Sequence, residues 1–297
     1  MNASGRTRFS ARHVEPITGY LFLLPDFLGL LAFLIIPIAY AFFISLHDWN
    51  GLSSMRWNGL DNYAKLFSDA QFWDSLKITA TYTLIYVPVV YTVSLGLALL
   101  VNQRLPSTRF FRTIFFVPVV LSLVVSSLMW KYIFDERAGL LNFLVGLIGI
   151  QPQPWLGSVE LALPSIIIVS VWIQMGYFMV IFIAGLQDIP REYYEAARID
   201  GANRWQMFLR ITLPLLKPTS LFVIVISLIG SFQVFDQVWV MTKGGPARAT
   251  QVTAVYIYQQ AFQYLNLGYG SAVAFVLFIV ILGFSLLQFR LLRTTHS

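Results

Sequence analysis

One polar stretch decides how this apolar chain is organised: Arg191-Glu-Tyr-Tyr-Glu-Ala-Ala-Arg-Ile-Asp-Gly-Ala-Asn-Arg-Trp-Gln-Met-Phe-Leu-Arg-Ile-Thr-Leu-Pro214. Pro190, just before it, suits the first turn of a helix, because the N–H group that proline lacks has no helical partner there. Glu192 and Glu195 follow, where carboxylates favour a helix N-terminus. The pattern predicts a helix that begins near residue 191.

The second half of the stretch predicts a bend and another short helix. Gly201 is typical of a helix end, and Asn203 can cap the helix that follows. Prolines at 214 and 218 would end that helix, and one of its faces would carry three apolar residues, Trp205, Phe208 and Leu209. Two short helices bent at a glycine are typical of a docking element rather than of a catalytic site.

The composition predicts an all-α integral membrane protein. Hydrophobic residues make up 57% of the chain and charged residues 11%, and the mean hydropathy is +0.70. A soluble domain has about 25% charged residues. Cysteine is absent, which excludes disulfides, thiolate metal sites and a cysteine nucleophile. The three histidines lie far apart, so they form no metal-binding pair on a helix.

Apolar segments predict six transmembrane helices. They cover residues 17–46, 78–101, 113–134, 161–186, 219–241 and 269–289. The chain then divides into a cytoplasmic segment 1–16, the first span 17–46, an extracytoplasmic interfacial loop 47–77 with a short amphipathic helix, a core of five helices over 78–290, and a cytoplasmic tail 291–297. The core includes the polar stretch within a loop at 187–218. The first apolar segment is too long for a signal-peptide core.

The basic residues predict the orientation of these spans. Most of them, including Arg6, Arg104, Arg112, Arg198 and Arg290, fall on one side if both termini are cytoplasmic. The loop 187–218 then faces the cytoplasm. Topology accounts for the net charge of +6, and nucleic-acid binding is not needed to explain it.

The chain carries no recognisable catalytic or nucleotide-binding motif. Lys243 precedes its glycines instead of following them, as a phosphate-binding loop would require. There is no His-Glu-x-x-His and no Gly-x-Ser-x-Gly. We therefore expect no enzyme activity and no cofactor bound by this chain.

Polar residues within the spans are candidates for a solute path, because each needs a partner, a cavity or water. Gln233, Asp236 and Gln237 are spaced to share one face of the fifth span, and Gln174 and Tyr177 lie in the fourth. Amides, a carboxylate and aromatic rings suit a neutral polyol. Hydrogen bonding between helices is an equally good explanation. Asp26, in the first span, is either solvated at the interface or a buried functional acid.

The polar stretch resembles the EAA motif of membrane permease subunits of ABC importers. The matching residues are Glu195-Ala-Ala, then Gly201, then Ile211-x-Leu-Pro214. The local form Ile189-Pro-x-Glu-Tyr-Tyr-Glu-Ala-Ala-x-x-Asp-Gly-Ala202 is similar to the carbohydrate-uptake branch, the maltose and glycerol-phosphate type. So is Phe235-Asp-x-Val-Trp-Val-Met-Thr-x-Gly-Gly-Pro246. Asp26 departs from the usually apolar start of the first span in this family.

The resemblance implies a type I importer fold in a prokaryotic cytoplasmic membrane, with a cytoplasmic coupling helix that docks on an ATP-hydrolysing subunit. The residues implied in this coupling are Glu195, Ala196, Ala197, Asp200, Gly201, Ala202, Trp205 and Phe208. The implied partners are two ATPase subunits that use ATP and Mg, a second permease subunit (a heterodimer being the commoner arrangement), an extracytoplasmic binding protein and membrane lipid.

The expected function is a permease subunit for a sugar or oligosaccharide. The same type of importer for glycerol phosphate or a polyamine is an alternative, although an anionic solute would favour basic residues that the candidate path lacks. An integral membrane enzyme would need clustered titratable residues, and a secondary transporter would need intramembrane acids. The sequence supplies neither.

Overall fold

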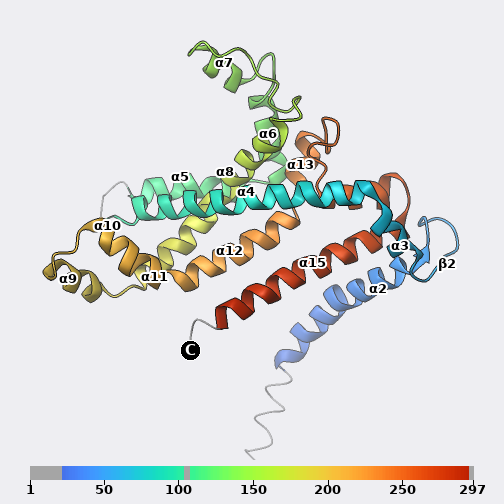
Figure 1. The fold of residues 1–297 in the computed structure, drawn as a ribbon, viewed down its shortest axis with the longest axis horizontal. Helices are drawn as coiled ribbons and strands as arrows, with labels where there is room; N and C mark the ends of the chain where they lie inside the picture. The colour runs from blue at the N-terminus through green and yellow to red at the C-terminus, as the bar shows by residue number, and fades with distance from the viewer. Residues whose placement is uncertain (1–21, 104–107, 294–297) are drawn as a thin grey trace, which may run out of the picture. The chain divides into compact units, whose positions relative to one another are not determined.

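The computed structural model describes residues 22–103 and 108–293 of the chain (Figure 1). The predicted segment 1–16, the start of the first predicted span at 17–21, Arg6, Arg104 and residues 294–297 lie outside the described residues. The chain forms two compact units. Of the described residues, unit 1 contains 22–66 and 260–275, and unit 2 contains 67–103, 108–259 and 276–293.

Unit 1 contains the first apolar helix and a small hairpin. The helix runs over Phe22–Ser45 and includes a π-helical turn, η1 (Leu31–Ile35), followed by α2 (Ile36–Ser45). The hairpin pairs β1 (His47–Asp48) with β2 (Arg56–Trp57), and α3 (Asp61–Ser68) follows. The Asn62 amide ties these parts together, since it donates to the carbonyls of Ser45 and His47 at 2.9 Å each. Asp26 is exposed on the first helix.

The long helices of unit 2 are α4 (Ala70–Val101), α8 (Ala162–Gln187) and α12 (Lys217–Phe232), and α15 (Leu267–Arg293) is shared between the units. α4 begins at Ala70, eight residues before the predicted start of the second span at residue 78. The Asp69 side chain accepts a hydrogen bond from the Gln71 N–H at 2.9 Å and caps the helix there. Likewise, α15 begins two residues before the predicted sixth span.

The third predicted span is broken in the structure. Its first part is α5 (Thr108–Val120), its second is α6 (Leu123–Ile133), and the two are bent by 101°. Pro118 lies just before the break and removes one helical hydrogen bond. Ser122 then adopts an extended ψ of 134°.

The fifth predicted span is also interrupted. α12 ends at Phe232, and a short helix, α13 (Asp236–Met241), starts only after three residues of irregular backbone. A further bend of 65° separates α12 from the preceding helical segment Arg204–Leu215. Counting only long apolar helices gives four candidate spans, and counting each bent pair as one span gives up to six in the described chain.

Two predicted loops contain short helices. α7 (Leu140–Gly146) lies between α6 and α8, and α14 (Thr253–Tyr258) lies between α13 and α15, followed by the π-helical turn η3 (Gln259–Gln263). The Thr79 hydroxyl accepts a hydrogen bond from the Thr253 N–H at 2.8 Å, which attaches the start of α14 to α4. α13 and α14 therefore both belong to the packed body of unit 2.

The core of unit 2 is built on the contact between α4 and α8. Its fully buried members include Val90, Ile166, Met179 and Phe182. α5 packs against the other side of α8, where Gly176 allows a close approach. A Cβ atom on Gly176 would lie 2.0 Å from the Phe115 carbonyl oxygen, so only glycine fits there.

Gly176→Ala is expected to destabilise unit 2 by about 1–3 kcal/mol, because the backbone of α5 must move away from α8. The measurement is the midpoint of thermal aggregation in detergent, followed by size-exclusion chromatography. Gly96→Ala on α4 is the matched control, since nothing lies within 4 Å of its added Cβ. Equal midpoints for the two variants would contradict the close packing of α5 on α8.

Candidate functional site

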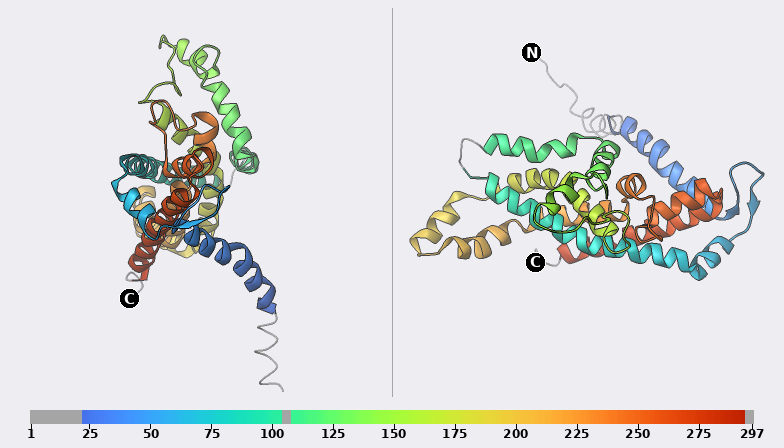
Figure 2. Two further views of the ribbon diagram at one scale, coloured as in Figure 1. Left: turned by 90° about the vertical axis from the view of Figure 1, so that its right-hand side faces the viewer. Right: turned by 90° about the horizontal axis from the view of Figure 1, so that it is seen from above.

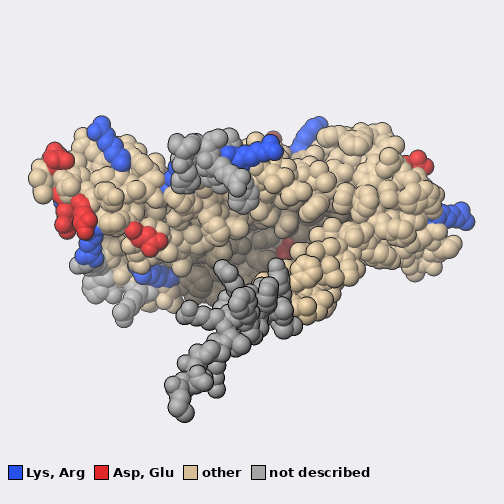
Figure 3. Space-filling view, turned by 90° about the horizontal axis from the view of Figure 1, so that it is seen from below, with Lys and Arg blue, Asp and Glu red and all other residues tan. Residues whose placement is uncertain are grey.

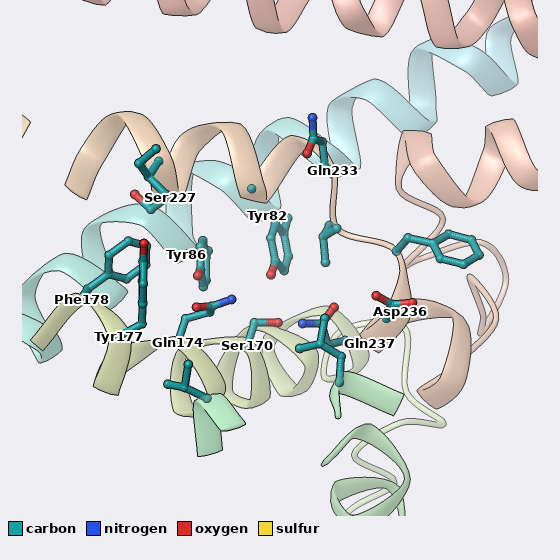
Figure 4. A pocket seen from close by; sticks show the side chains of 16 residues that line it. Tyr82, Tyr86, Ser170, Gln174, Tyr177, Phe178, Ser227, Gln233, Asp236 and Gln237 are labelled. Carbon is teal, nitrogen blue, oxygen red and sulfur yellow. The ribbon is translucent and has the colours of Figure 1, made fainter. Parts of the chain in front are cut away.

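A cavity of about 400 Å³ lies within unit 2 (Figure 4). α4, α8, α12 and α13 supply most of its wall, and the α5–α6 break adds apolar residues. Its polar and aromatic lining consists of Tyr82, Tyr86, Ser170, Gln174, Tyr177, Phe178, Ser227, Gln233, Phe235, Asp236 and Gln237. All five residues of the predicted solute path are therefore in the wall of one cavity.

One side of the cavity joins α4 to α8 through hydroxyl and amide groups. The Tyr82 and Tyr86 rings stack with their centroids 5.4 Å apart, and both hydroxyls point toward α8 in Figure 4. Ser170 lies on α8 across from Tyr82 in the same view, and its hydroxyl donates to the Ile166 carbonyl at 2.9 Å. Gln174 lies one turn further along α8, beside Tyr86 in the same view. The arrangement presents flat aromatic faces next to donors and acceptors.

The other side of the cavity is formed by the break between α12 and α13. The prediction that Gln233, Asp236 and Gln237 share one helix face was wrong, since the helix ends before Gln233 and restarts at Asp236. The irregular backbone at residues 233–235 nevertheless places all three residues in the cavity wall. Gln237 is buried at 7% exposure, whereas Gln233 is exposed and projects away from Gln174 in Figure 4.

The charge of the wall is low. Asp236 is the charged residue in the lining, and no lysine or arginine of the described chain contributes to it. Four further polar residues of the wall were not among the predicted path residues: Tyr82, Tyr86, Ser170 and Ser227. Tyr82 and Tyr86 are four residues apart in an apolar span, and this spacing was the available signal for a polar helix face.

The polar stretch 191–214 forms the second candidate site. α9 (Arg191–Ile199) begins after Pro190, and Gly201 follows with a φ of +79°. Two hydrogen bonds close the end of α9, from Gly201 N–H to the Arg198 carbonyl at 3.1 Å and from Ala202 N–H to the Ala197 carbonyl at 2.8 Å. This pattern needs a left-handed residue, which glycine adopts without strain. The predicted helix end at Gly201 is confirmed.

The second helix of the stretch, α10 (Arg204–Met207), begins at a reciprocal cap. The Asn203 side chain accepts from the Gln206 N–H, and the Gln206 side chain accepts from the Asn203 N–H, each at 2.9 Å. Pro214 does not end this helix, contrary to the prediction. The chain continues through a π-helical turn, η2 (Phe208–Thr212), and α11 (Leu213–Leu215), and turns only at Leu216.

The two faces of this segment differ. Glu195, Ala196 and Asp200 are exposed, as are Ile199 at 87% and Trp205 at 66%. Figure 3 shows acidic and basic side chains gathered over this end of unit 2. The inner face packs on its own chain: the Tyr194 hydroxyl lies 3.0 Å from the Thr212 hydroxyl, and the half-buried residues include Ala197, Ala202 and Phe208.

Phe208, one of the residues implied in coupling, is half-buried. Its ring packs against the buried core of unit 2 and stacks on Trp205, with the ring centroids 5.6 Å apart. Trp205 therefore forms the exposed apolar surface of α10, and Phe208 contacts both Trp205 and the core of unit 2.

Comparison with known proteins shows the family to which this chain belongs. Residues 91–295 match the family described as binding-protein-dependent transport system inner membrane component. The chain is 34% identical to the trehalose/maltose transport system permease protein MalF of Thermococcus litoralis, over 95% of this chain and 96% of that protein. It is 36% identical to the arabinooligosaccharides transport system permease protein AraP of Bacillus subtilis, over 96% of this chain and 91% of that one.

A solved structure has the same fold as this chain. A bacterial ABC transporter involved in the import of the acidic polysaccharide alginate has a chain that is 25% identical, with a TM-score of 0.85 over 98% of this chain and all of that one. The protein described here belongs to the inner-membrane components of binding-protein-dependent transport systems. It is an ABC importer permease and an integral membrane protein.

Proposed function

We propose that this chain is the permease subunit of an ATP-driven importer for a neutral sugar or oligosaccharide, and that the cavity of unit 2 is part of the solute path. The observation that carries this proposal is the convergence of Gln174, Tyr177, Asp236 and Gln237 with the Tyr82 and Tyr86 rings on one cavity. Sugar hydroxyls need both donors and acceptors, and sugar rings stack on aromatic faces. Such mixed walls are typical of small-molecule sites.

The wall also disfavours an anionic solute such as glycerol phosphate. It contains Asp236 and no cationic side chain from the described chain, so a phosphate or a sugar acid would be repelled. The related importer of alginate handles an acidic polysaccharide, and this cavity does not offer the matching charge. A polyamine remains the alternative that Asp236 could favour.

The exposed half of the segment 191–214 is the proposed coupling site for an ATP-hydrolysing subunit. Glu195 and Ala196 lie on the exposed face of α9, and Trp205 gives α10 an apolar contact. Asp200, Gly201 and Ala202 shape the turn between the helices. Phe208 acts from the inner side, where it packs against the core, and Ala197 is half-buried in α9.

The topology and the partner subunits of the importer follow from this assignment. Both termini and the segment 191–214 face the cytoplasm of a prokaryote, α5 and α6 together count as one of six spans, and α12 with α13 forms another. Two ATPase subunits, a second permease subunit and an extracytoplasmic binding protein complete the importer. An alginate transporter of the same fold has been solved with its pentasaccharide-bound periplasmic protein. ATP and Mg²⁺ are used by the partner subunits, and this chain binds no cofactor.

Uptake measurements in a strain that lacks this gene test the proposed substrate class. Labelled maltose, trehalose, lactose and arabinotriose are supplied as neutral solutes, with glycerol 3-phosphate and putrescine as charged comparators. Uptake of at least one neutral sugar is expected to return when the gene is restored. Restored uptake of a charged comparator alone would contradict the proposal.

A further inference from the structure

The segment that links α6 to α8 carries an apolar surface that the solute path and the coupling site do not use. Residues 138–159 contain no lysine, arginine, aspartate or glutamate. Large apolar side chains of this segment are exposed, among them Leu140, Phe143 at 65%, Leu144, Leu147, Ile148 at 74% and Ile150. We call these six residues the α7 platform.

The α7 platform is held in a defined shape by the opposite face of the segment. Asn142 is buried and acts as the central polar group. Its Nδ2 donates to the carbonyls of Glu136 and Gln153 at 3.0 and 2.9 Å, and its Oδ1 accepts from the Gln153 N–H and the Trp155 indole at 3.0 and 2.8 Å. Leu141 packs beside it against the core of unit 2. The apolar side chains are therefore displayed by an ordered scaffold.

The edge of the segment is polar. The Asp135 carboxylate accepts hydrogen bonds from the N–H groups of Arg137 and Ala138 at 3.0 and 2.9 Å, and these bonds lower the pKa of that carboxyl group. Glu136 and Glu160 are exposed at the two ends. Charged residues therefore lie on both sides of the α7 platform but not within it. Such a distribution suits a segment that lies in a bilayer interface while its two ends remain in water.

The exposed face of α6 continues into the platform. Val124, Val125, Leu128 and Tyr132 are exposed along α6, which is part of a candidate membrane span. Within unit 2, α6 turns away from the direction of α5, and α7 lies at its far end (Figures 1 and 2). The same apolar environment that covers α6 can therefore extend over α7.

We propose that the α7 platform inserts into the lipid bilayer interface beside α6, on the side of the membrane that faces away from the segment 191–214. A soluble partner is a poorer match, because interfaces that form and dissociate are no more apolar than ordinary protein surface. Lipid also fits the lack of basic residues, which makes insertion depend on apolar burial rather than on anionic headgroups. α6 packs against α13, the helix that contains the cavity residues Asp236 and Gln237. Lipid contact at α7 therefore anchors the far end of a helix that supports the cavity wall.

Spin-label accessibility tests this assignment, and the lack of cysteine in the chain makes single-site labelling simple. Phe143→Cys and Ile148→Cys are labelled in the importer assembled with cysteine-free partner subunits, in nanodiscs of phosphatidylcholine alone and of phosphatidylcholine with phosphatidylglycerol. Val125→Cys on α6 is the lipid-facing reference, and Glu136→Cys, just outside the platform, is the aqueous reference.

Both platform labels are expected to be more accessible to oxygen than to a water-soluble nickel chelate in either lipid, as at Val125 and in contrast to Glu136. Preferential access of the nickel chelate, with protection only after the binding protein is added, would assign the surface to that protein and overturn the proposal. Low access of both reagents would place a neighbouring subunit there and would overturn it as well. Neither result bears on the solute path, which is tested by uptake.

Discussion

Glu195→Lys is expected to abolish uptake while the chain still inserts into the membrane at its normal level. Glu195 is exposed on α9, and within the described part of the chain it forms no hydrogen bond or ion pair, so the substitution should leave the fold intact. If it pairs with a basic group on the ATPase subunit, charge reversal costs about 2–5 kcal/mol of docking free energy, more than about tenfold in affinity. Co-purification of the ATPase subunit and ATP-driven uptake are the two measurements.

Glu192→Lys is the matched control, because it makes the same charge change on an exposed residue one turn earlier in α9. It is expected to reduce uptake far less. If Glu195→Lys transports normally, or if both variants fail equally, the pairing assigned to Glu195 is wrong.

Gly201 provides a second, independent test of the same site. Its φ of +79° strains a β-branched residue, although an added Cβ would meet nothing within 4 Å in this chain. Gly201→Val is therefore expected to disturb the turn and lose uptake, whereas Gly201→Asn, which tolerates a left-handed conformation, should retain part of it. Equal activity of the two variants would show that the backbone of this turn is not needed for coupling.

Gln237→Leu is expected to lower the rate of sugar uptake by about 5- to 150-fold at limiting substrate, because loss of a buried hydrogen bond between the Gln237 amide and a sugar hydroxyl costs about 1–3 kcal/mol. Gln237 is nearly fully buried in the cavity wall, and leucine has a similar volume, so the loss should come from hydrogen bonding rather than from packing. Uptake as a function of substrate concentration and retention of the ATPase subunit are measured together.

Gln233→Leu serves as the comparison, since Gln233 lines the same cavity but is exposed and points away from Gln174. A smaller effect is expected there. Release of the ATPase subunit by Gln237→Leu, or an unchanged rate of uptake, would remove Gln237 from the solute path.

The sequence predicted the helices that depend on local signals. Asn203 caps α10 as expected, with Gln206 completing the cap, and Gly201 takes the backbone conformation that ends α9. These features follow from residues close together in the chain, so a single sequence contains the necessary information.

The breaks in the spans could not be predicted with the same reasoning. Apolar length identifies a segment that can cross a membrane, but it does not show whether the helix is continuous. The backbone at residues 233–235 leaves the helix without a proline or glycine at the break, and tertiary packing of α13 on α6 decides its course. The five path residues could be predicted because they are polar, but Gln233, Asp236 and Gln237 do not share one helix face.

The interruption between α12 and α13 also has a consequence for how the cavity recognises a solute. At the end of α12 the Gly230 and Ser231 carbonyls accept bonds from the Gln233 and Val234 N–H groups at 3.2 and 3.5 Å, and the first turn of α13 has main-chain N–H groups without helical partners. Peptide groups at this break that reach the solute would add donors and acceptors that no side-chain substitution removes. An alanine scan of the wall would therefore understate its capacity for hydroxyl groups, and substrates that differ in side groups but share a ring of hydroxyls could use the same peptide contacts.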